Sequence, residues 1–162
     1  MRNFRNPHTG IRINEALTLQ RSKVDFADML LTVFGKGAKE RKVPFTLELR
    51  PVLFRWLSHP KTPASALVFV TRTGGRVSHR NAFREVQLLA KRAGLQAHVH
   101  PHLFRHQYAA NFIRHGGDIY RLSRLLGHTT VTVTQTYLRS LGVEDLRSGR
   151  ERLSPLCSSQ AD

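Results

Sequence analysis

Residues 102–137 constrain the fold of this chain more than any other part of the sequence. Pro101 precedes them, and its fixed φ suits the first turn of a helix whose apolar residues then recur with a helical period. A Gly-Gly pair ends this helix, Asp118 is suited to cap a second one, and Gly127 ends that helix in turn. The pattern therefore predicts three consecutive helices, of which the last carries Tyr137.

Four side chains of this segment could act together on one surface. His102 and Arg105 are three residues apart, so they share a face of the first helix. His128 follows the turn after the second helix, and Tyr137 lies on the third. An imidazole, a guanidinium, a second imidazole and a phenol form a set that suits the phosphodiester backbone of DNA.

The composition points to a polyanionic partner. The chain has 162 residues, enough for one domain with a proper core, and a formal net charge of +15. Nucleic acid is the first candidate and an acidic membrane the second, while the alternative is a basic domain without special affinity. No apolar run approaches the roughly 20 residues of a membrane span, and the N-terminus lacks a secretory signal. The single cysteine, Cys157, fits a reducing cytoplasm.

The first half of the chain predicts a short helix, a β-hairpin and two longer helices. A helix capped by Thr9 or Asn14 is expected to run to about Leu19, with Arg12 and Glu15 three residues apart in it. By itself, that pair is most simply a surface ion pair of little energetic value. The other expected elements are strands at 29–34 and 39–45 joined by a turn at 35–38, a helix at 46–57 that is regular from Leu49, a strand at 67–70, and a helix from a Ser78 cap to Ala93.

Several motifs together resemble those of the tyrosine recombinases, the phage integrase family. The sequences H-L-F-R and L-L-G-H, followed by Tyr137, are similar to the family's C-terminal catalytic box. T-G-I-R-I-N-E resembles the family's T-G-L-R-x-S-E, with isoleucine and asparagine as mild departures, and K-E-R-K-V-P resembles its K-E-R-x-V-P. Lys36 lies between two glycines at the position where the family keeps a lysine in a β-hairpin.

The resemblance implies a metal-free phosphoryl transfer with a role for each matching residue. Two arginines hold the scissile phosphate, the tyrosine attacks it, and a histidine takes the phenol proton. The hairpin lysine protonates the leaving 5′ oxygen, the second histidine hydrogen-bonds a phosphate oxygen, and an acidic residue supports the site. Arg12 and Arg105 match the two arginines, Tyr137 matches the nucleophile, and His102 matches the histidine that takes its proton. Lys36 matches the hairpin lysine, His128 the second histidine and Glu15 the acidic residue.

The resemblance also implies a fold and a domain plan. We expect an α+β domain that is mostly helical, with a small antiparallel sheet on one side. Residues 1–153 are expected to form a catalytic domain without the family's separate N-terminal DNA-binding domain, and residues 154–162 a disordered tail. Basic residues expected to contact DNA lie in the predicted hairpin and in the helix after Ser78, namely Lys39, Arg41, Arg80, Arg84 and Lys91.

The predicted function is cleavage and rejoining of DNA strands through a 3′-phosphotyrosine, without metal or nucleotide. No G-x-x-x-x-G-K-[ST] motif occurs. His98, His100 and His102 alternate, but a metal site there is disfavoured because no carboxylate or cysteine lies nearby. The implied partners are double-stranded DNA and further protomers of a tetrameric synapse, in the nucleoid of a bacterial cytoplasm. Two alternatives remain, a type IB topoisomerase and a DNA-binding remnant without catalytic activity.

Overall fold

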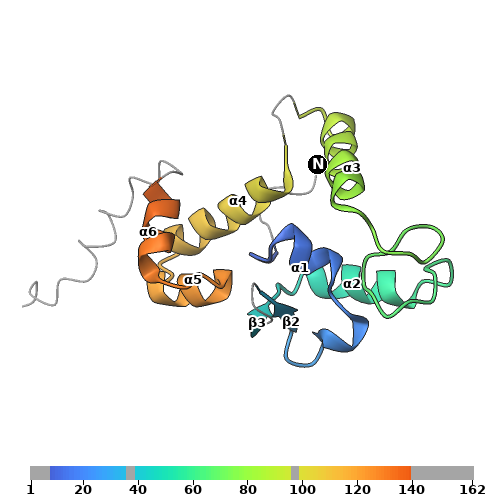
Figure 1. Ribbon diagram of the computed structural model, residues 1–162, viewed down its shortest axis with the longest axis horizontal. Coiled ribbons are helices and arrows are strands. Elements are labelled where there is room, and N and C mark those ends of the chain that lie inside the picture. Colours follow the sequence, from blue (N-terminus) through green and yellow to red (C-terminus); the bar gives the residue numbers. More distant parts are fainter. Residues whose placement is uncertain (1–7, 36–38, 96–98, 140–162) are drawn as a thin grey trace, which may run out of the picture.

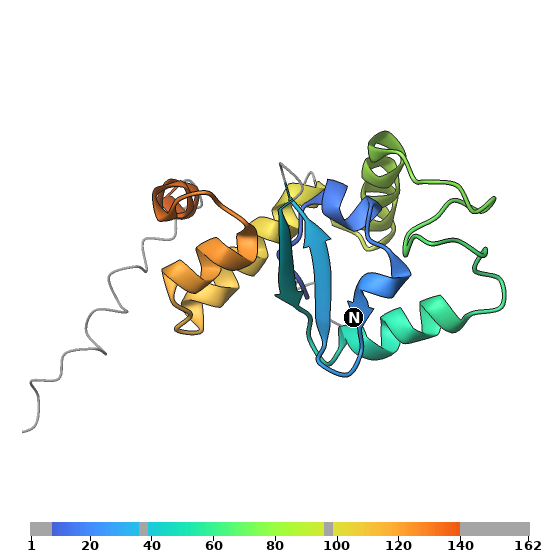
Figure 2. The same cartoon turned by 60° about the horizontal axis from the view of Figure 1, so that its bottom comes forward.

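The structure is a computed structural model that describes residues 8–35, 39–95 and 99–139. Within these ranges the chain forms six α-helices and one three-stranded antiparallel sheet, which confirms the expected mostly helical α+β fold. Figure 1 shows the three C-terminal helices gathered on one side of the molecule. Figure 2 shows the sheet between these helices and helices α2 and α3.

The predicted hairpin is confirmed and gains a short third strand. The strands are β1 (Val24–Asp25), β2 (Leu30–Phe34) and β3 (Glu40–Pro44), in the order β1-β2-β3. In the β2–β3 register, Leu30 is opposite Pro44 and Phe34 is opposite Glu40. Side chains alternate along both strands, so that Leu31, Val33 and Val43 are buried. The turn at 36–38, and with it Lys36, lies outside the described residues.

The other elements of the first half follow the prediction with two corrections. Helix α1 (Ile13–Leu17) begins after Arg12, and neither Thr9 nor Asn14 caps it. The strand predicted at 67–70 is wrong, because Leu67 and Val70 form isolated bridges to two different segments and no continuous pairing. Helices α2 (Leu49–Ser58) and α3 (His79–Arg92) are confirmed, and the Ser78 hydroxyl caps α3 by accepting a hydrogen bond from the Asn81 N–H at 3.1 Å.

The three predicted C-terminal helices are also confirmed. They are α4 (Pro101–Arg114), α5 (Ile119–Leu126) and α6 (Val131–Arg139). The Asp118 carboxylate caps α5 by accepting a hydrogen bond from the Arg121 N–H at 2.9 Å. Gly127 ends α5 with a φ of +64°, a left-handed conformation that favours glycine. The tail expected at residues 154–162 lies outside the described residues.

Two hydrophobic clusters hold these elements together. The first lies between the sheet and α2, and the second joins α4, α5 and α6. Two arginine side chains join the first half of the chain to the end of α5, since Arg12 donates to the Gly127 carbonyl and Arg41 to the Leu125 carbonyl. Buried members of the first are Leu19, Leu31, Val33, Val43, Phe45, Leu53 and Val68, and those of the second are Ala109, Leu122, Leu126 and Leu138.

The described residues contain neither a membrane-spanning helix nor a cluster of metal ligands. None of the helices in these ranges is long and apolar enough to cross a bilayer. His100 and His102 belong to the start of α4 and not to a strand, and no group of three potential metal ligands occurs among the described residues.

Candidate functional site

Three arginines converge on the C-terminal end of α5. The last carbonyls of a helix have no partner within it and lie at the negative end of the helix dipole, so cations are favoured there. The three guanidinium groups come from β3, from α4 and from the residue that precedes α1. Arg41 Nε donates to the Leu125 carbonyl at 2.9 Å, Arg105 Nη2 to that of Leu126 at 2.7 Å, and Arg12 Nη2 to that of Gly127 at 3.3 Å.

Arg105 is the most deeply buried of the three, with 5% of its surface exposed. Besides its bond to α5, its Nη1 donates to the Gly10 carbonyl at 2.6 Å, and its Nη2 lies 3.2 Å from His128 Nε2. Burial, together with the charge of Arg12, lowers the pKa of Arg105 to about 10. The guanidinium therefore stays charged at neutral pH and supplies a fixed positive charge inside the site.

His128 follows the turn at the end of α5 and is held on both ring nitrogens. Its Nε2 faces Arg105, which can only donate, so Nε2 acts as the acceptor. Its Nδ1 then carries the proton and donates to the Thr134 hydroxyl at 2.8 Å. Burial and the neighbouring Arg105 and Arg12 charges lower the pKa of His128 to about 4. The imidazole is therefore neutral at physiological pH.

Glu15 is a buried carboxylate that joins two of the arginines. Its oxygens accept hydrogen bonds from Arg41 Nη1 and Nη2 at 2.7 and 2.8 Å, from the Arg12 backbone N–H at 2.7 Å and from Arg12 Nη1 at 3.1 Å. Burial alone would raise the pKa of Glu15, but these bonds outweigh it and keep the pKa below its ordinary value. The simple surface pair of Arg12 and Glu15 is thus replaced by a network of three charges around the buried Glu15 carboxylate.

Tyr137 lies against this network from α6. Its hydroxyl is buried, its ring stacks on His106 with centroids 4.6 Å apart and an interplanar angle of 22°, and it meets the His128 ring edge-on at 5.7 Å. Burial raises the pKa of Tyr137, and the charge of Arg105 partly offsets that rise. The phenol is therefore neutral at physiological pH and close to the buried guanidinium.

Five of the seven expected catalytic residues come together, and His102 stands apart from them. Arg12, Glu15, Arg105 and His128 form one connected set with Tyr137 beside it. His102 is exposed on α4, 6.4 Å from the His100 ring, and none of the hydrogen bonds among the described residues joins it to that set. Lys36 lies outside the described residues.

The structure also places two residues in roles that the sequence did not predict. Arg41 was expected to contact DNA, but its side chain is only 14% exposed and all three of its guanidinium nitrogens bond inside the protein. His106, adjacent to Arg105, stacks on the Tyr137 ring. The K-E-R-K-V-P motif was the available signal for Arg41, whereas no pattern in the sequence predicts a stacking contact between α4 and α6.

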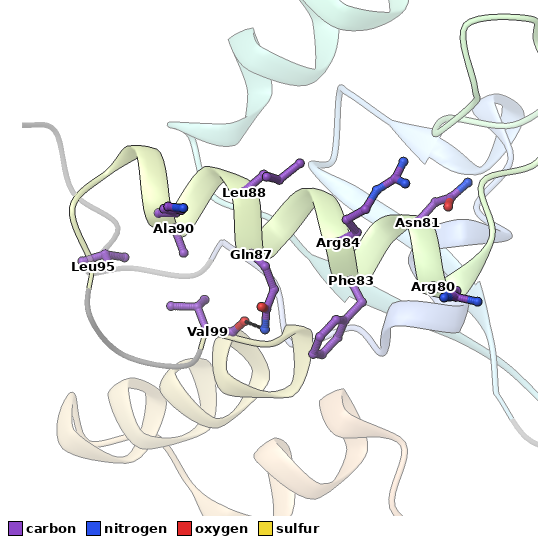
Figure 3. Close-up of a pocket in the computed structure, with 10 residues that line it drawn as sticks. Arg80, Asn81, Phe83, Arg84, Gln87, Leu88, Ala90, Leu95 and Val99 are labelled. Atoms are coloured by element: carbon purple, nitrogen blue, oxygen red, sulfur yellow. Dashed lines mark hydrogen bonds between the residues drawn. The ribbon is translucent and has the colours of Figure 1, made fainter.

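The other residues expected to contact DNA are on the surface. Lys39 is exposed just before β3. Arg80, Arg84 and Lys91 are exposed on α3 and line a hollow of about 610 Å³, which Val99 also lines. Figure 3 shows Arg80 and Arg84 on the N-terminal half of α3, with Gln87 turned toward Val99.

Comparisons with known proteins agree with this geometry. The model of the phage integrase family matches residues 7–142. The tyrosine recombinase XerC of Actinobacillus pleuropneumoniae serotype 7 is 35% identical over 131 residues, covering 80% of this chain and 43% of that protein. The XerC of Xanthomonas campestris is 36% identical over 129 residues, covering 80% of this chain and 40% of that protein. The chain thus spans less than half the length of these curated relatives.

Solved structures share the fold. The crystal structure of XerA recombinase superimposes with a TM-score of 0.80 at 30% identity, covering 92% of this chain and 55% of that one. The catalytic domain of bacteriophage HP1 integrase superimposes with a TM-score of 0.57 at 27% identity, covering 94% of this chain and 80% of that one.

Proposed function

Since the chain belongs to the phage integrase family, we propose that it cleaves and rejoins DNA strands through a covalent link between Tyr137 and a 3′-phosphate. The observation that carries this proposal is the position of the Tyr137 phenol beside the buried Arg105 guanidinium and the neutral His128 ring. A phenol held near fixed positive charge is suited to attack a phosphodiester, because the charge stabilises both the phenolate and the oxygens of the reacting phosphate.

The proposed step balances without a cofactor. The Tyr137 oxygen attacks phosphorus, the bond from phosphorus to the 5′ oxygen breaks, and the 3′-phosphotyrosine and a free 5′-hydroxyl result. Religation by the 5′-hydroxyl reverses the step. The phenol proton goes to a base, for which His102 is our candidate from its exposed place one turn before Arg105. Lys36 is the proposed donor of the proton that the 5′ oxygen receives.

The arginines divide the work of holding the phosphate. Arg12 is 36% exposed, so its guanidinium can meet a phosphate that arrives from solvent. Arg105 is buried, and its bonds to two backbone carbonyls fix its orientation before DNA binds. Donors that are already oriented need no reorganisation during the reaction, which is the main advantage of such electrostatic stabilisation.

We also propose how the chain meets its partners. The exposed cations of α3 and Lys39 would contact the DNA backbone, and the net charge of +15 would draw DNA to the protein. Residues 1–153 would act as the catalytic domain, together with further protomers on DNA, in the nucleoid of a bacterial cytoplasm.

The test is covalent capture on randomly nicked duplex DNA. When a strand is cut close to a nick, the short piece between them diffuses away and religation fails, so the adduct accumulates whatever the target sequence. We expect an adduct that survives denaturing electrophoresis with the wild-type chain and with Tyr120→Phe, whose tyrosine is 65% exposed. Tyr137→Phe should bind the same DNA and give no adduct. DNA binding without any wild-type adduct would instead identify a DNA-binding protein without this activity.

A further inference from the structure

The His106 ring stacks on the ring of the proposed nucleophile, Tyr137. The two centroids are 4.6 Å apart and the planes are 22° from parallel, which is the offset stacking that aromatic pairs favour. His106 comes from α4, directly after Arg105, while Tyr137 comes from α6. The stack therefore joins the helix that carries the buried guanidinium to the helix that carries the phenol.

The face of the His106 imidazole stacks on Tyr137, while one of its ring nitrogens has no hydrogen-bond partner among the described residues. Its Nδ1 is buried, and none of the residues that the structure describes gives it a hydrogen bond. A buried polar atom without a partner costs stability. A phenylalanine would keep the aromatic plane and remove that cost, so the plane and the nitrogen can be separated by substitution.

We propose that His106 is a positioning residue for Tyr137, and that its ring plane is the surface on which the phenol is held beside Arg105 and His128. This inference rests on the proposed role of Tyr137. The His106 ring then lies against the face of the phenol, and the His128 ring meets it edge-on. Next to Tyr137, the fully buried Leu138 anchors α6 to α5. The helix is thus fixed by its apolar side chains, and the direction of the phenol is set by the stack.

The test compares two variants with opposite properties. His106→Phe keeps a ring and loses the nitrogen, whereas His106→Asn keeps a polar atom near Nδ1 and loses the ring. With saturating randomly nicked DNA, we expect His106→Phe to form adduct within about threefold of the wild-type rate and His106→Asn to be about tenfold slower, the loss of one aromatic pair. The dissociation constant for DNA should not change, and His115→Asn, at the exposed end of the same helix, should match the wild type.

A second readout does not depend on catalysis. In spectra of a chain with labelled tyrosine rings, the stack shifts the Tyr137 resonances, while Tyr108 and Tyr120 serve as internal references. We expect the Tyr137 shift to persist in His106→Phe and to vanish in His106→Asn, and the melting temperature of His106→Phe to equal or exceed that of the wild type. Should His106→Asn fail to fold, His106→Leu supplies the variant with apolar volume and no aromatic plane.

The outcomes separate the two proposals. If the wild-type chain gives no adduct, the proposed function fails, and the resonance shifts still decide whether His106 holds the phenol. If the wild type gives adduct but His106→Phe is as slow as His106→Asn, or His106→Asn is as fast as the wild type, the ring plane is not what matters and the inference is wrong.

Discussion

The Arg41 guanidinium binds the buried Glu15 carboxylate through two hydrogen bonds of 2.7 and 2.8 Å. Its remaining nitrogen, Nε, donates to the Leu125 carbonyl at 2.9 Å. One side chain of the hairpin thus fixes both the acid that orients Arg12 and the helix end that precedes His128. All three Arg41 guanidinium nitrogens are used in these bonds, so we expect Arg41 to act on the site through Glu15 and the end of α5.

Removing Arg41 should destabilise the protein. In Arg41→Met, Glu15 keeps only its bonds to Arg12, and leaving a buried charge incompletely paired costs about 3 kcal/mol. Urea unfolding measures this cost, with Arg50→Met on the exposed face of α2 as the matched control. The double variant Arg41→Met with Glu15→Leu should lose less free energy of unfolding than the sum of the losses in the two single variants. The reason is that the double variant leaves no buried carboxylate incompletely paired. Equal stability of Arg41→Met and the control would contradict this account.

The end of α5 should not tolerate a side chain at Gly127. A Cβ there would lie 2.9 Å from the Arg41 guanidinium carbon, and the φ of +64° adds a backbone cost of about 1–2 kcal/mol. Gly116→Ala is the matched control, because its φ of +80° is equally left-handed and nothing lies within 4 Å of the added atom. We expect Gly127→Ala to lower the free energy of unfolding more than Gly116→Ala does. Equal losses of unfolding free energy in the two variants would mean that the Arg41 side chain can move away from the added methyl group at no cost.

Stability should fall as the pH drops from 6.5 toward 4, in part because of His128. Its pKa is about 4 in the folded chain against an ordinary 6.5, so between these values the unfolded chain binds the extra proton and unfolding is favoured. His128→Gln should flatten this part of the stability curve, as measured by urea unfolding at a series of pH values. Glu15, whose folded pKa is lowered, adds a loss of the same sign only below 4.5. Parallel curves for wild type and variant between pH 6.5 and 5 would refute the assignment.

DNA affinity should depend steeply on salt, with α3 contributing. If Arg80 contacts a phosphate, Arg80→Ala should weaken binding and reduce the slope of log affinity against log salt by about one. The measurement is a titration of labelled duplex DNA at several salt concentrations. Arg50→Ala, with an exposed cation on α2, tests whether the effect belongs to α3 or to net charge alone. An unchanged slope in Arg80→Ala would remove α3 from the proposed DNA surface.

The sequence by itself determined most of the local structure and pointed to most of the residues that gather at the candidate site. Pro101, the Asp118 cap and Gly127 set the C-terminal helices because these residues act on their own backbone, where position in the chain is enough. Motif spacing likewise identified Arg12, Arg105, His128 and Tyr137, which the structure brings together. The strand predicted at 67–70 was wrong because pairing depends on a neighbour that local pattern does not reveal.

Only the tertiary structure decided which charged side chains are buried and which ring stacks on the Tyr137 phenol. Arginine is usually a surface residue. Arg41 is mostly buried because it bonds to Glu15 and to the Leu125 carbonyl at the end of α5, which come from distant parts of the chain. His106 meets Tyr137 only because α4, α5 and α6 pack together in one hydrophobic cluster. Such contacts join residues far apart in sequence, and their energies depend on burial and geometry that no local pattern encodes.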